Sequence, residues 1–308
     1  MIRFRTQVLL AALALSLCAC SSVDNYRIGS DALKAHDYDA VIQYTTIAVG
    51  TGNLPPSMQA RAYRNRGDAY FEKGEMEPAI ADFTSALMID ATVDDTFNRR
   101  GVAYSNIGKF DLAAEDFSHA IALRSWKTEY YINRGIAYRR LGEYDKAIAD
   151  DNEAVRRHAS DVHVYENRAA AFRAIRQYDQ AAADYTQAIR LSPTDPVNYS
   201  DRCSVLVLAG KPNNALADCD RSLALKPDNP TAFDWRGFAL YKTQQYGAAI
   251  RDYDAALKLD PKLVTSLYMR GLAKLKMGDA GGGNTDMRAA TAIDPKIAMN
   301  LQTLGVTR

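Results

Sequence analysis

An arginine recurs at a fixed interval along most of this chain. Successive members of the series are 34 residues apart, and they are Arg66, Arg100, Arg134, Arg168, Arg202, Arg236 and Arg270. A constant period of this length is typical of repeat architectures, in which similar supersecondary units stack on one another. The repeat therefore constrains the fold before any single helix is considered.

Small residues recur with the same period. With the arginine as position 7 of the unit, the units begin at residues 60, 94, 128, 162, 196, 230 and 264. Position 8 holds Gly67, Gly101, Gly135, Ala169, Cys203, Gly237 and Gly271, and positions 20 and 27 are also small in every unit. Two helices approach closely only where the side chains between them are short. Each unit is therefore predicted to be a tight antiparallel helical hairpin.

Larger apolar residues and helix breakers complete the unit. Position 11 carries Tyr70, Tyr104, Tyr138, Phe172, Leu206 and Leu240, and position 24 is mostly aromatic. Glycine marks the turn inside the hairpin in five units, at Gly74, Gly108, Gly142, Gly210 and Gly278. Proline follows the second helix in four units, at Pro193, Pro227, Pro261 and Pro295. Both residue types are expected where helices end.

This pattern resembles the tetratricopeptide repeat (TPR) family. The resemblance implies an all-α fold, a right-handed superhelical α-solenoid of about eight hairpins with a short capping helix. We expect seven consecutive units, 60–93, 94–127, 128–161, 162–195, 196–229, 230–263 and 264–297, and a cap or tail over 298–308. A degenerate first unit is expected over 22–59, with Gly29 at position 8 and Tyr38 at the start of its second helix.

The N-terminus has the features of an export signal. Residues 1–19 combine Arg3 and Arg5 with an apolar run too short to span a bilayer. The following Leu17-Cys18-Ala19-Cys20 resembles a lipoprotein cleavage motif, which implies lipidation of Cys20 and a short tether over 20–26. Ser21 favours the outer membrane by the same resemblance. The alternatives are an ordinary secretory signal with soluble release, or a short membrane anchor.

An aspartate accompanies each arginine. Position 23 holds Asp82, Asp116, Asp150, Asp184, Asp218, Asp252 and Asp286. We expect an Arg–Asp ladder, formed within or between hairpins, in preference to a basic stripe for polyanions. Asp151 occupies position 24, where other units have an aromatic residue, and no proline follows its helix. A bend or soft point is therefore expected near 150–162.

Two cysteines share one unit. Cys203 and Cys219 occupy positions 8 and 24, so they face each other across the hairpin. In an oxidising compartment they would form a disulfide. The alternative is a pair of small buried thiols that fill the space of a small residue and an aromatic one.

The first helices are expected to line a peptide-binding groove. Its early part would present an incomplete asparagine ladder and several cations, at Asn65, Arg99, Asn133, Arg139, Asn167 and Arg173. Its late part would present apolar side chains, at Leu208, Trp235, Phe238, Tyr241 and Tyr268. A carboxamide can pair with a peptide group, and exposed aromatic clusters often mark binding sites. The alternatives are solvated asparagines, and an apolar patch covered by the last helix or by a second copy of the chain.

Composition excludes several function classes. The net charge is +1, which gives no bulk attraction to nucleic acid. No metal-binding His-Glu-x-x-His or Cys-x-x-Cys motif occurs, and His158 and His163 are better explained as surface residues at a turn. We therefore expect no enzyme, no cofactor and no metal.

These features predict a scaffold for other proteins. The chain would be a lipid-anchored adaptor at the periplasmic face of the outer membrane, binding peptide segments of envelope proteins, with self-association also open. The alternative is a soluble or cytoplasmic interaction module without a lipid anchor.

Overall fold

The computed structural model describes residues 21–158 and 160–306. Within these residues the regular structure is entirely helical, as the repeat predicted. The expected signal peptide 1–19 and Cys20 lie outside the described residues. The chain divides into two compact units at Ala154 and Val155, inside α8. This division falls in the 150–162 segment, where the sequence predicted a soft point.

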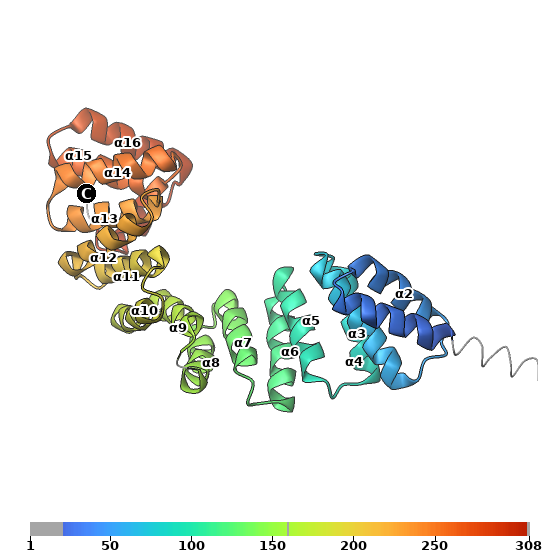
Figure 1. Ribbon diagram of the computed structural model, residues 1–308. Helices are drawn as coiled ribbons and strands as arrows, with labels where there is room; N and C mark the ends of the chain where they lie inside the picture. Colours follow the sequence, from blue (N-terminus) through green and yellow to red (C-terminus); the bar gives the residue numbers. More distant parts are fainter. Residues whose placement is uncertain (1–20, 159, 307–308) are drawn as a thin grey trace, which may run out of the picture. The chain divides into compact units, whose positions relative to one another are not determined.

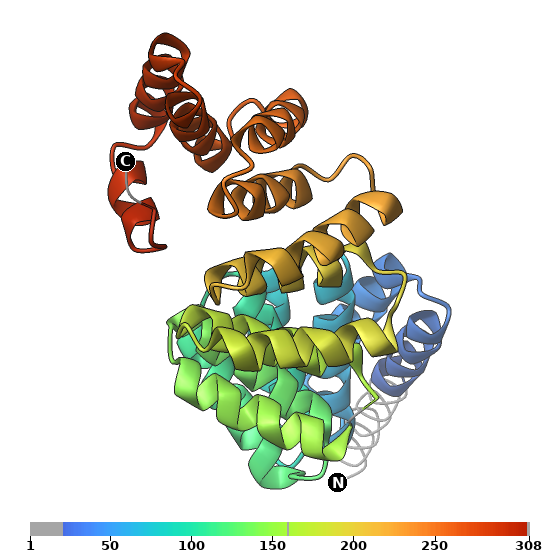
Figure 2. The ribbon, with the colours of Figure 1, turned by 90° about the vertical axis from the view of Figure 1, so that its left-hand side faces the viewer.

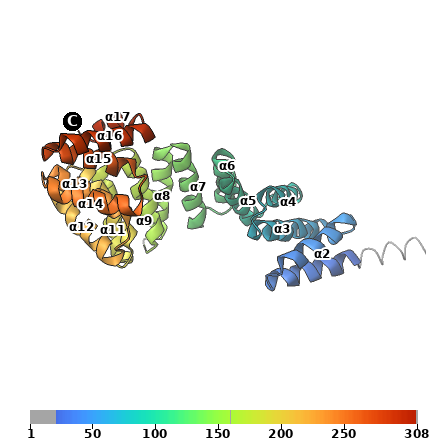
Figure 3. The same ribbon diagram turned by 90° about the horizontal axis from the view of Figure 1, so that it is seen from above.

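Unit 1, residues 21–154, is a stack of four helical hairpins. Each first helix pairs with the helix that follows it, and successive hairpins pack side by side (Figures 1 and 3). The pairs are residues 21–34 with α2 (Tyr38–Gly50), α3 (Pro56–Glu72) with α4 (Met76–Ile89), α5 (Asp94–Asn106) with α6 (Phe110–Leu123), and α7 (Thr128–Leu141) with α8 (Tyr144–Arg157).

Unit 2, described over residues 155–158 and 160–306, repeats this arrangement and adds a short last helix. Its pairs are α9 (Val162–Ala174) with α10 (Tyr178–Leu191), α11 (Pro196–Leu208) with α12 (Pro212–Leu225), α13 (Pro230–Lys242) with α14 (Tyr246–Leu259), and α15 (Val264–Lys276) with α16 (Ala280–Ile293). The last helix, α17 (Ile297–Gln302), packs against α15 and α16. The described residues thus form eight hairpins and a capping helix, an α-solenoid.

The helices end where the sequence predicted. The five turn glycines all have positive φ, the conformation that glycine adopts at little cost. Three turns of the described hairpins lack glycine, and there His36, Arg176 and Gln244 adopt φ of 57°, 63° and 63°. Proline occupies the first turn of α11, α12 and α13, where the missing N–H has no helical partner. Local sequence therefore sets the length of each helix.

The first hairpin begins earlier than expected. Residues 21–26, predicted to be a tether, instead form the start of the helix over 21–34. Ser22 is buried and its hydroxyl is 2.5 Å from that of Thr51, while Val23 and Tyr26 pack against the apolar cluster around Ala48. These contacts hold in a helix a segment that the resemblance to a lipoprotein cleavage motif predicted to be a tether.

One contact recurs at the centre of the hairpins. Position 8 of the first helix lies against position 24 of the second, so a Cβ on Gly101 would approach the Phe117 ring to 2.7 Å. In the last hairpin the backbones themselves meet, because a Cβ on Gly283 would lie 2.7 Å from the carbonyl oxygen of Gly271. A larger residue at these points would separate the two helices.

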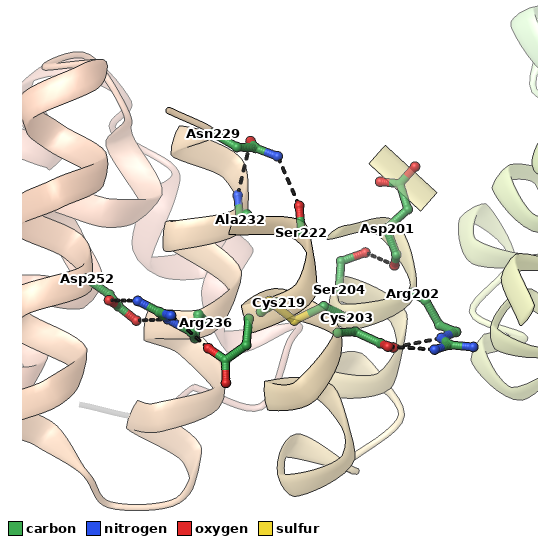
Figure 4. The surroundings of a disulfide bond; sticks show 12 residues. Asp201, Arg202, Cys203, Ser204, Cys219, Ser222, Asn229, Ala232, Arg236 and Asp252 are labelled. Atoms are coloured by element: carbon green, nitrogen blue, oxygen red, sulfur yellow. Dashed lines mark hydrogen bonds and ion pairs between the residues drawn. A yellow bond between two sulfur atoms is a disulfide. The ribbon is translucent and has the colours of Figure 1, made fainter. Parts of the chain in front are cut away.

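A disulfide occupies this contact in the α11–α12 hairpin. Cys203 and Cys219 are bonded, with their Cα atoms 5.5 Å apart, and both side chains are buried (Figure 4). The separation is typical of disulfide geometry. Positions 8 and 24, which hold a small residue and a large one in most other hairpins, are therefore also close enough for a disulfide.

Asp151 takes the same place in the α7–α8 hairpin. Its side chain is buried, and its Oδ1 would lie 2.9 Å from a Cβ on Gly135. A carboxylate thus fills the volume that an aromatic ring fills in the neighbouring repeats. Burial of a carboxylate is costly in free energy, which is consistent with the division of the chain shortly after this residue.

The predicted Arg–Asp ladder is confirmed. Each position-7 arginine donates from Nε and one Nη to both oxygens of the position-23 aspartate of its own hairpin, at 2.5–2.8 Å. The other Nη of six arginines reaches position 25 of the preceding hairpin, and these acceptors are Thr46, Thr84, Ser118, Thr186, Asp220 and Asp254. Where both hairpins belong to one unit, each arginine therefore closes its own hairpin and also joins it to the previous one.

Two buried tyrosines at position 24 differ in their partners. Tyr185 forms a hydrogen bond with Asp201, at position 6 of the next repeat, whereas the hydroxyl of Tyr253 is buried without a hydrogen-bond partner among the described residues. In the repeat after Tyr253, position 6 is Met269, which has no carboxylate to accept a hydrogen bond from the tyrosine hydroxyl as Asp201 does. An unsatisfied buried hydroxyl destabilises the folded state.

We therefore expect opposite results from two matched substitutions. Tyr253→Phe should leave the free energy of unfolding unchanged or raise it by about 1 kcal/mol, because it removes an unpaired polar group. Tyr185→Phe should lower it by about 1–3 kcal/mol, because it removes a bond to a charged acceptor. Urea unfolding followed by circular dichroism measures both, and equal losses in the two variants would contradict this account.

Candidate functional site

A basic cavity opens on the first-helix face of unit 1, which is the surface formed by residues 21–34, α3, α5 and α7. Its volume is about 430 Å³, and it lies between residues 21–34 and α3. Its lining residues include Lys34, Arg61, Arg64, Asn65 and Asp90. Three cations and one carboxylate give the cavity a positive charge.

The two arginines of this cavity are available to a ligand. Neither Arg61 nor Arg64 forms a hydrogen bond or an ion pair with any described residue, whereas Lys34 is paired with the exposed Asp31 at 2.7 Å. The pKa of Asp90 is lowered, mainly by hydrogen bonds from Thr92 and to a smaller extent by these two arginines. The cavity thus offers guanidinium groups without a fixed partner, which suit carboxylates.

The asparagine ladder is partly engaged within the protein. Asn65 donates to the hydroxyl of Ser30 in the preceding repeat at 3.1 Å, and Asn133 donates to the Oδ1 of Asn98 at 2.9 Å. Asn98 in turn donates to Glu129 at 3.1 Å. The carboxamides of Asn65 and Asn133 therefore join successive repeats. Sequence reasoning missed Asn98, although its place at position 5, beside the ladder position, was visible.

Arg99 is held by two carboxylates. Its Nε donates to Asp95 at 2.9 Å, and one Nη lies 3.3 Å from Asp68 of the preceding repeat. Burial raises the pKa of Asp68 to about 6, although Arg99 and then Arg64 oppose the shift. Desolvation thus outweighs the attraction of the nearby guanidinium groups for this carboxylate.

The raised pKa predicts a pH dependence of stability. Between the unfolded pKa of about 4 and the folded pKa of about 6, the folded state binds more protons at Asp68 than the unfolded state does. Stability from this group is therefore present at low pH and declines as the pH rises through that window. We expect Asp68→Asn to remove this decline. The free energy of unfolding of the variant should therefore rise relative to that of the wild type between pH 4 and pH 7. Urea unfolding at several pH values measures it, and a constant difference would contradict it.

The remaining predicted early groove residues are divided between the two units. In unit 1, Arg139 is half-buried and its Nε has no hydrogen-bond partner among the described residues. In unit 2, Arg173 is exposed and lies 3.8 Å from Asp201, and the half-buried Asn167 side chain forms no hydrogen bond with the described residues.

The late apolar patch is not an open surface. Phe238 and Tyr268 are buried, while Leu208, Trp235 and Tyr241 are half-buried. Trp235 stacks on Phe238 with ring centroids 5.9 Å apart. The same buried cluster contains Ile297, Leu301 and Val306 from the end of the chain. The expectation of an exposed groove here was therefore wrong, because the chain's own last segment packs into this cluster.

A further polar cluster joins two repeats in unit 1. The buried Asp94 accepts a hydrogen bond from Tyr130 at 2.5 Å and lies 2.8 Å from Arg124 and 3.0 Å from Lys127. Burial, together with the hydrogen bond to Asp94, raises the pKa of Tyr130 to about 12. Every charged group of this cluster has an opposite partner, so it stabilises the packing of α5 on α7 and offers no free reactive group.

Two other kinds of site are absent from residues 21–158 and 160–306. No group of three or more His, Cys, Asp or Glu side chains is placed to hold a metal ion there. In that part of the chain, no helix combines the length and apolarity needed to cross a membrane.

Comparison with known families agrees with the geometry. A family model described as "Tetratricopeptide repeat" matches residues 26–93, 98–162 and 132–196, and one described as "TPR repeat" matches 239–278. Together these matches cover more than half of the chain. The chain belongs to the tetratricopeptide repeat family. Proteins of this family act generally as scaffolds for protein interaction. No curated relative matches the sequence.

Solved TPR structures share the fold. A tetratricopeptide repeat protein from Parabacteroides merdae is 18% identical with a TM-score of 0.60, and the match covers 82% of this chain and 98% of that one. The C-terminal part of a TPR protein from Cytophaga hutchinsonii is 19% identical with a TM-score of 0.60, covering 79% and 98%. MamA is 20% identical with a TM-score of 0.52, covering 56% and 92%. At these identities the similarity concerns the fold alone.

Proposed function

We propose that this TPR protein is a non-catalytic adaptor, lipid-anchored at the periplasmic face of the outer membrane, which binds acidic peptide segments of envelope proteins in the basic cavity of unit 1. The observation that carries the peptide part is the pair of arginines, Arg61 and Arg64, which line the cavity and form no hydrogen bond or ion pair with the described residues. The anchoring part rests on the sequence Leu17-Cys18-Ala19-Cys20 alone.

The dimensions and chemistry of the cavity suit a short peptide segment. A volume of about 430 Å³ lies within the range of small-ligand pockets and accommodates a few residues. The guanidinium groups would pair with Asp or Glu side chains of the ligand, and the free Oδ1 of Asn65 would accept a peptide N–H. Binding of this kind is electrostatic and weakens with salt.

Charge reversal tests the peptide proposal. The probe is a fluorescein-labelled decapeptide rich in glutamate, with a glutamine-for-glutamate peptide as its control. Arg61→Glu with Arg64→Glu should weaken binding of the acidic probe at least tenfold, whereas Arg190→Glu, on an exposed site of unit 2, should leave it unchanged. Equal affinity for the two peptides, or no effect of the double substitution, would refute the acidic-peptide site.

Metabolic labelling tests the anchor separately. The wild-type chain expressed in a bacterium and labelled with palmitate should carry the label, Cys20→Ala should abolish it, and Cys18→Ala should retain it. Fractionation of the labelled cells should place the chain with the outer membrane. An unlabelled wild-type chain would favour the soluble interaction module instead.

A further inference from the structure

The last described residues of the chain return to the first-helix face of unit 2, which is formed by α9, α11, α13 and α15. After α16 the chain turns back into α17, beside the C label in Figure 2. Ile297, Leu301 and Val306 are only 4%, 3% and 4% exposed. They belong to the buried cluster that contains Phe238 and Tyr268. Residues 297–306 are called the tail segment below.

The tail segment ends in a helix-terminating turn. Val306 N–H donates to the carbonyl of Leu301 at 3.1 Å, Gly305 N–H donates to that of Gln302 at 2.9 Å, and Gly305 has a φ of 71°. This is the pattern of a helix closed by a left-handed glycine. It satisfies the carbonyls of Leu301 and Gln302, but those of Thr303, Leu304 and Gly305 have no backbone partner among the described residues and lie at the negative end of the helix.

Two cations from distant parts of unit 2 contact these carbonyls. Lys242, at the end of α13, donates to the carbonyl of Gly305 at 2.6 Å and to that of Leu304 at 3.5 Å. Arg176, in the turn between α9 and α10, donates to the carbonyl of Thr303 at 3.5 Å. Positive side chains are favourable at the C-terminal end of a helix. The tail segment is therefore bound at its apolar side and at its polar end.

A capping role alone does not require these contacts. A cap needs only to cover the apolar surface of the last hairpin, which α17 does by packing on α15 and α16. Lys242 belongs to the repeat before that hairpin, and Arg176 to a repeat two further back. The contacts thus extend along the first-helix face, where a TPR ligand would lie, rather than over the end of the stack.

We propose that the first-helix face of unit 2 is a peptide-binding surface which the tail segment occupies in cis. The partner that fits it is a short amphipathic helix with aliphatic residues spaced as Ile297, Leu301 and Val306 are, ending in a turn whose carbonyls meet Lys242 and Arg176. Such a partner binds by displacing the tail segment. This inference concerns unit 2 only, so it does not depend on the acidic-peptide cavity or the lipid anchor.

The experiment supplies the tail segment as a separate molecule. The probe is a fluorescein-labelled synthetic peptide with the sequence of residues 295–308, and a peptide with Asp in place of Leu301 and Val306 is its control. In the full chain, Leu301→Asp with Val306→Asp should release the tail segment. Anisotropy should show that the released chain binds the probe at least tenfold more tightly than the wild type, in which the surface is occupied.

Two further variants make the result specific. Lys242→Met in the released chain should weaken probe binding at least threefold, while Lys258→Met, at an exposed site on α14, should not change it. A released chain that remains helical by circular dichroism and binds the probe no more tightly than the wild type would overturn the proposal.

Hydrogen exchange on the unmodified chain decides the question if the released chain does not fold. The amides of Leu304, Gly305 and Val306 are hydrogen-bonded within the tail segment. If the segment is displaceable, they should exchange at least tenfold faster than the amides of α15, because they open without unfolding the hairpin. Exchange in step with α15 would show a permanent cap and would overturn the proposal.

Discussion

Replacing Asp116 by alanine is expected to lower the free energy of unfolding by about 3–5 kcal/mol, because it leaves the half-buried guanidinium of Arg100 without its carboxylate. Asp116 is only 3% exposed. Burial raises its pKa even though Arg100 opposes the shift. Burial also acts to lower the pKa of Arg100, but the hydrogen bond and the charge of Asp116 together outweigh it, so that pKa is raised. Each charge therefore depends on the other. Urea unfolding monitored by circular dichroism measures the loss.

Two controls separate the ladder from ordinary surface ion pairs. Glu143→Ala removes the partner of Lys146 from an exposed pair at 2.6 Å and should destabilise the protein far less than Asp116→Ala does. Arg100→Met combined with Asp116→Leu removes both charges and should destabilise less than Asp116→Ala alone, since no unpaired charge remains. If the double variant were less stable than Asp116→Ala, the ion pair would stabilise the folded state by more than the neutralisation of two buried charges.

Reduction of the disulfide is expected to lower the stability of unit 2 by about 3 kcal/mol, the chain-entropy value for a loop of this length. The bond joins α11 to α12 at their closest approach, so its loss should loosen the hairpin that stands between α10 and α13. Urea unfolding with and without dithiothreitol measures the change. A free-thiol titration of the denatured, unreduced chain should find neither Cys203 nor Cys219 reactive.

A designed replacement provides the matched control. Cys203→Gly with Cys219→Phe restores the pair found at Gly101 and Phe117, where a Cβ would approach the ring to 2.7 Å. This variant should be insensitive to dithiothreitol and more stable than Cys203→Ala with Cys219→Ala, which leaves a cavity. Equal stability of the wild type in the oxidised and reduced states would argue against a stabilising bond.

The fold could be predicted from the sequence because each repeat constrains the others. A glycine at position 8 is weak evidence alone, but Gly67, Gly101 and Gly135 at a constant interval define a helix contact. The sequence does not show which aspartate pairs with each arginine. The aspartate of the same hairpin and the aspartate of the neighbouring hairpin both recur every 34 residues, so the two pairings would produce the same sequence pattern. The acceptors at position 25 were missed because they vary between Thr, Ser and Asp.

The candidate site was predicted less well. Arg61 and Arg64 precede the predicted Asn65 on the same helix, but periodicity does not show that they form no ion pair with the described residues, because this depends on where Asp31 and Asp90 point. The covering of Phe238 and Tyr268 depends on the path of residues outside the repeat, for which periodicity gives no information. Sequence periodicity thus determines which residues share a face, while non-repeating segments determine whether that face is free.

The hydrogen bond that a ladder arginine donates to position 25 of the preceding hairpin makes the two units respond differently to ionic strength. In unit 1 the acceptors that join successive hairpins are uncharged hydroxyls, at Thr46, Thr84 and Ser118. In unit 2 two of them are carboxylates, Asp220 and Asp254, which are 62% and 54% exposed. Salt screens exposed ion pairs but has little effect on neutral hydrogen bonds. Concentrated salt should therefore make the late repeats more compliant under mechanical load and leave the stiffness of the early ones unaltered.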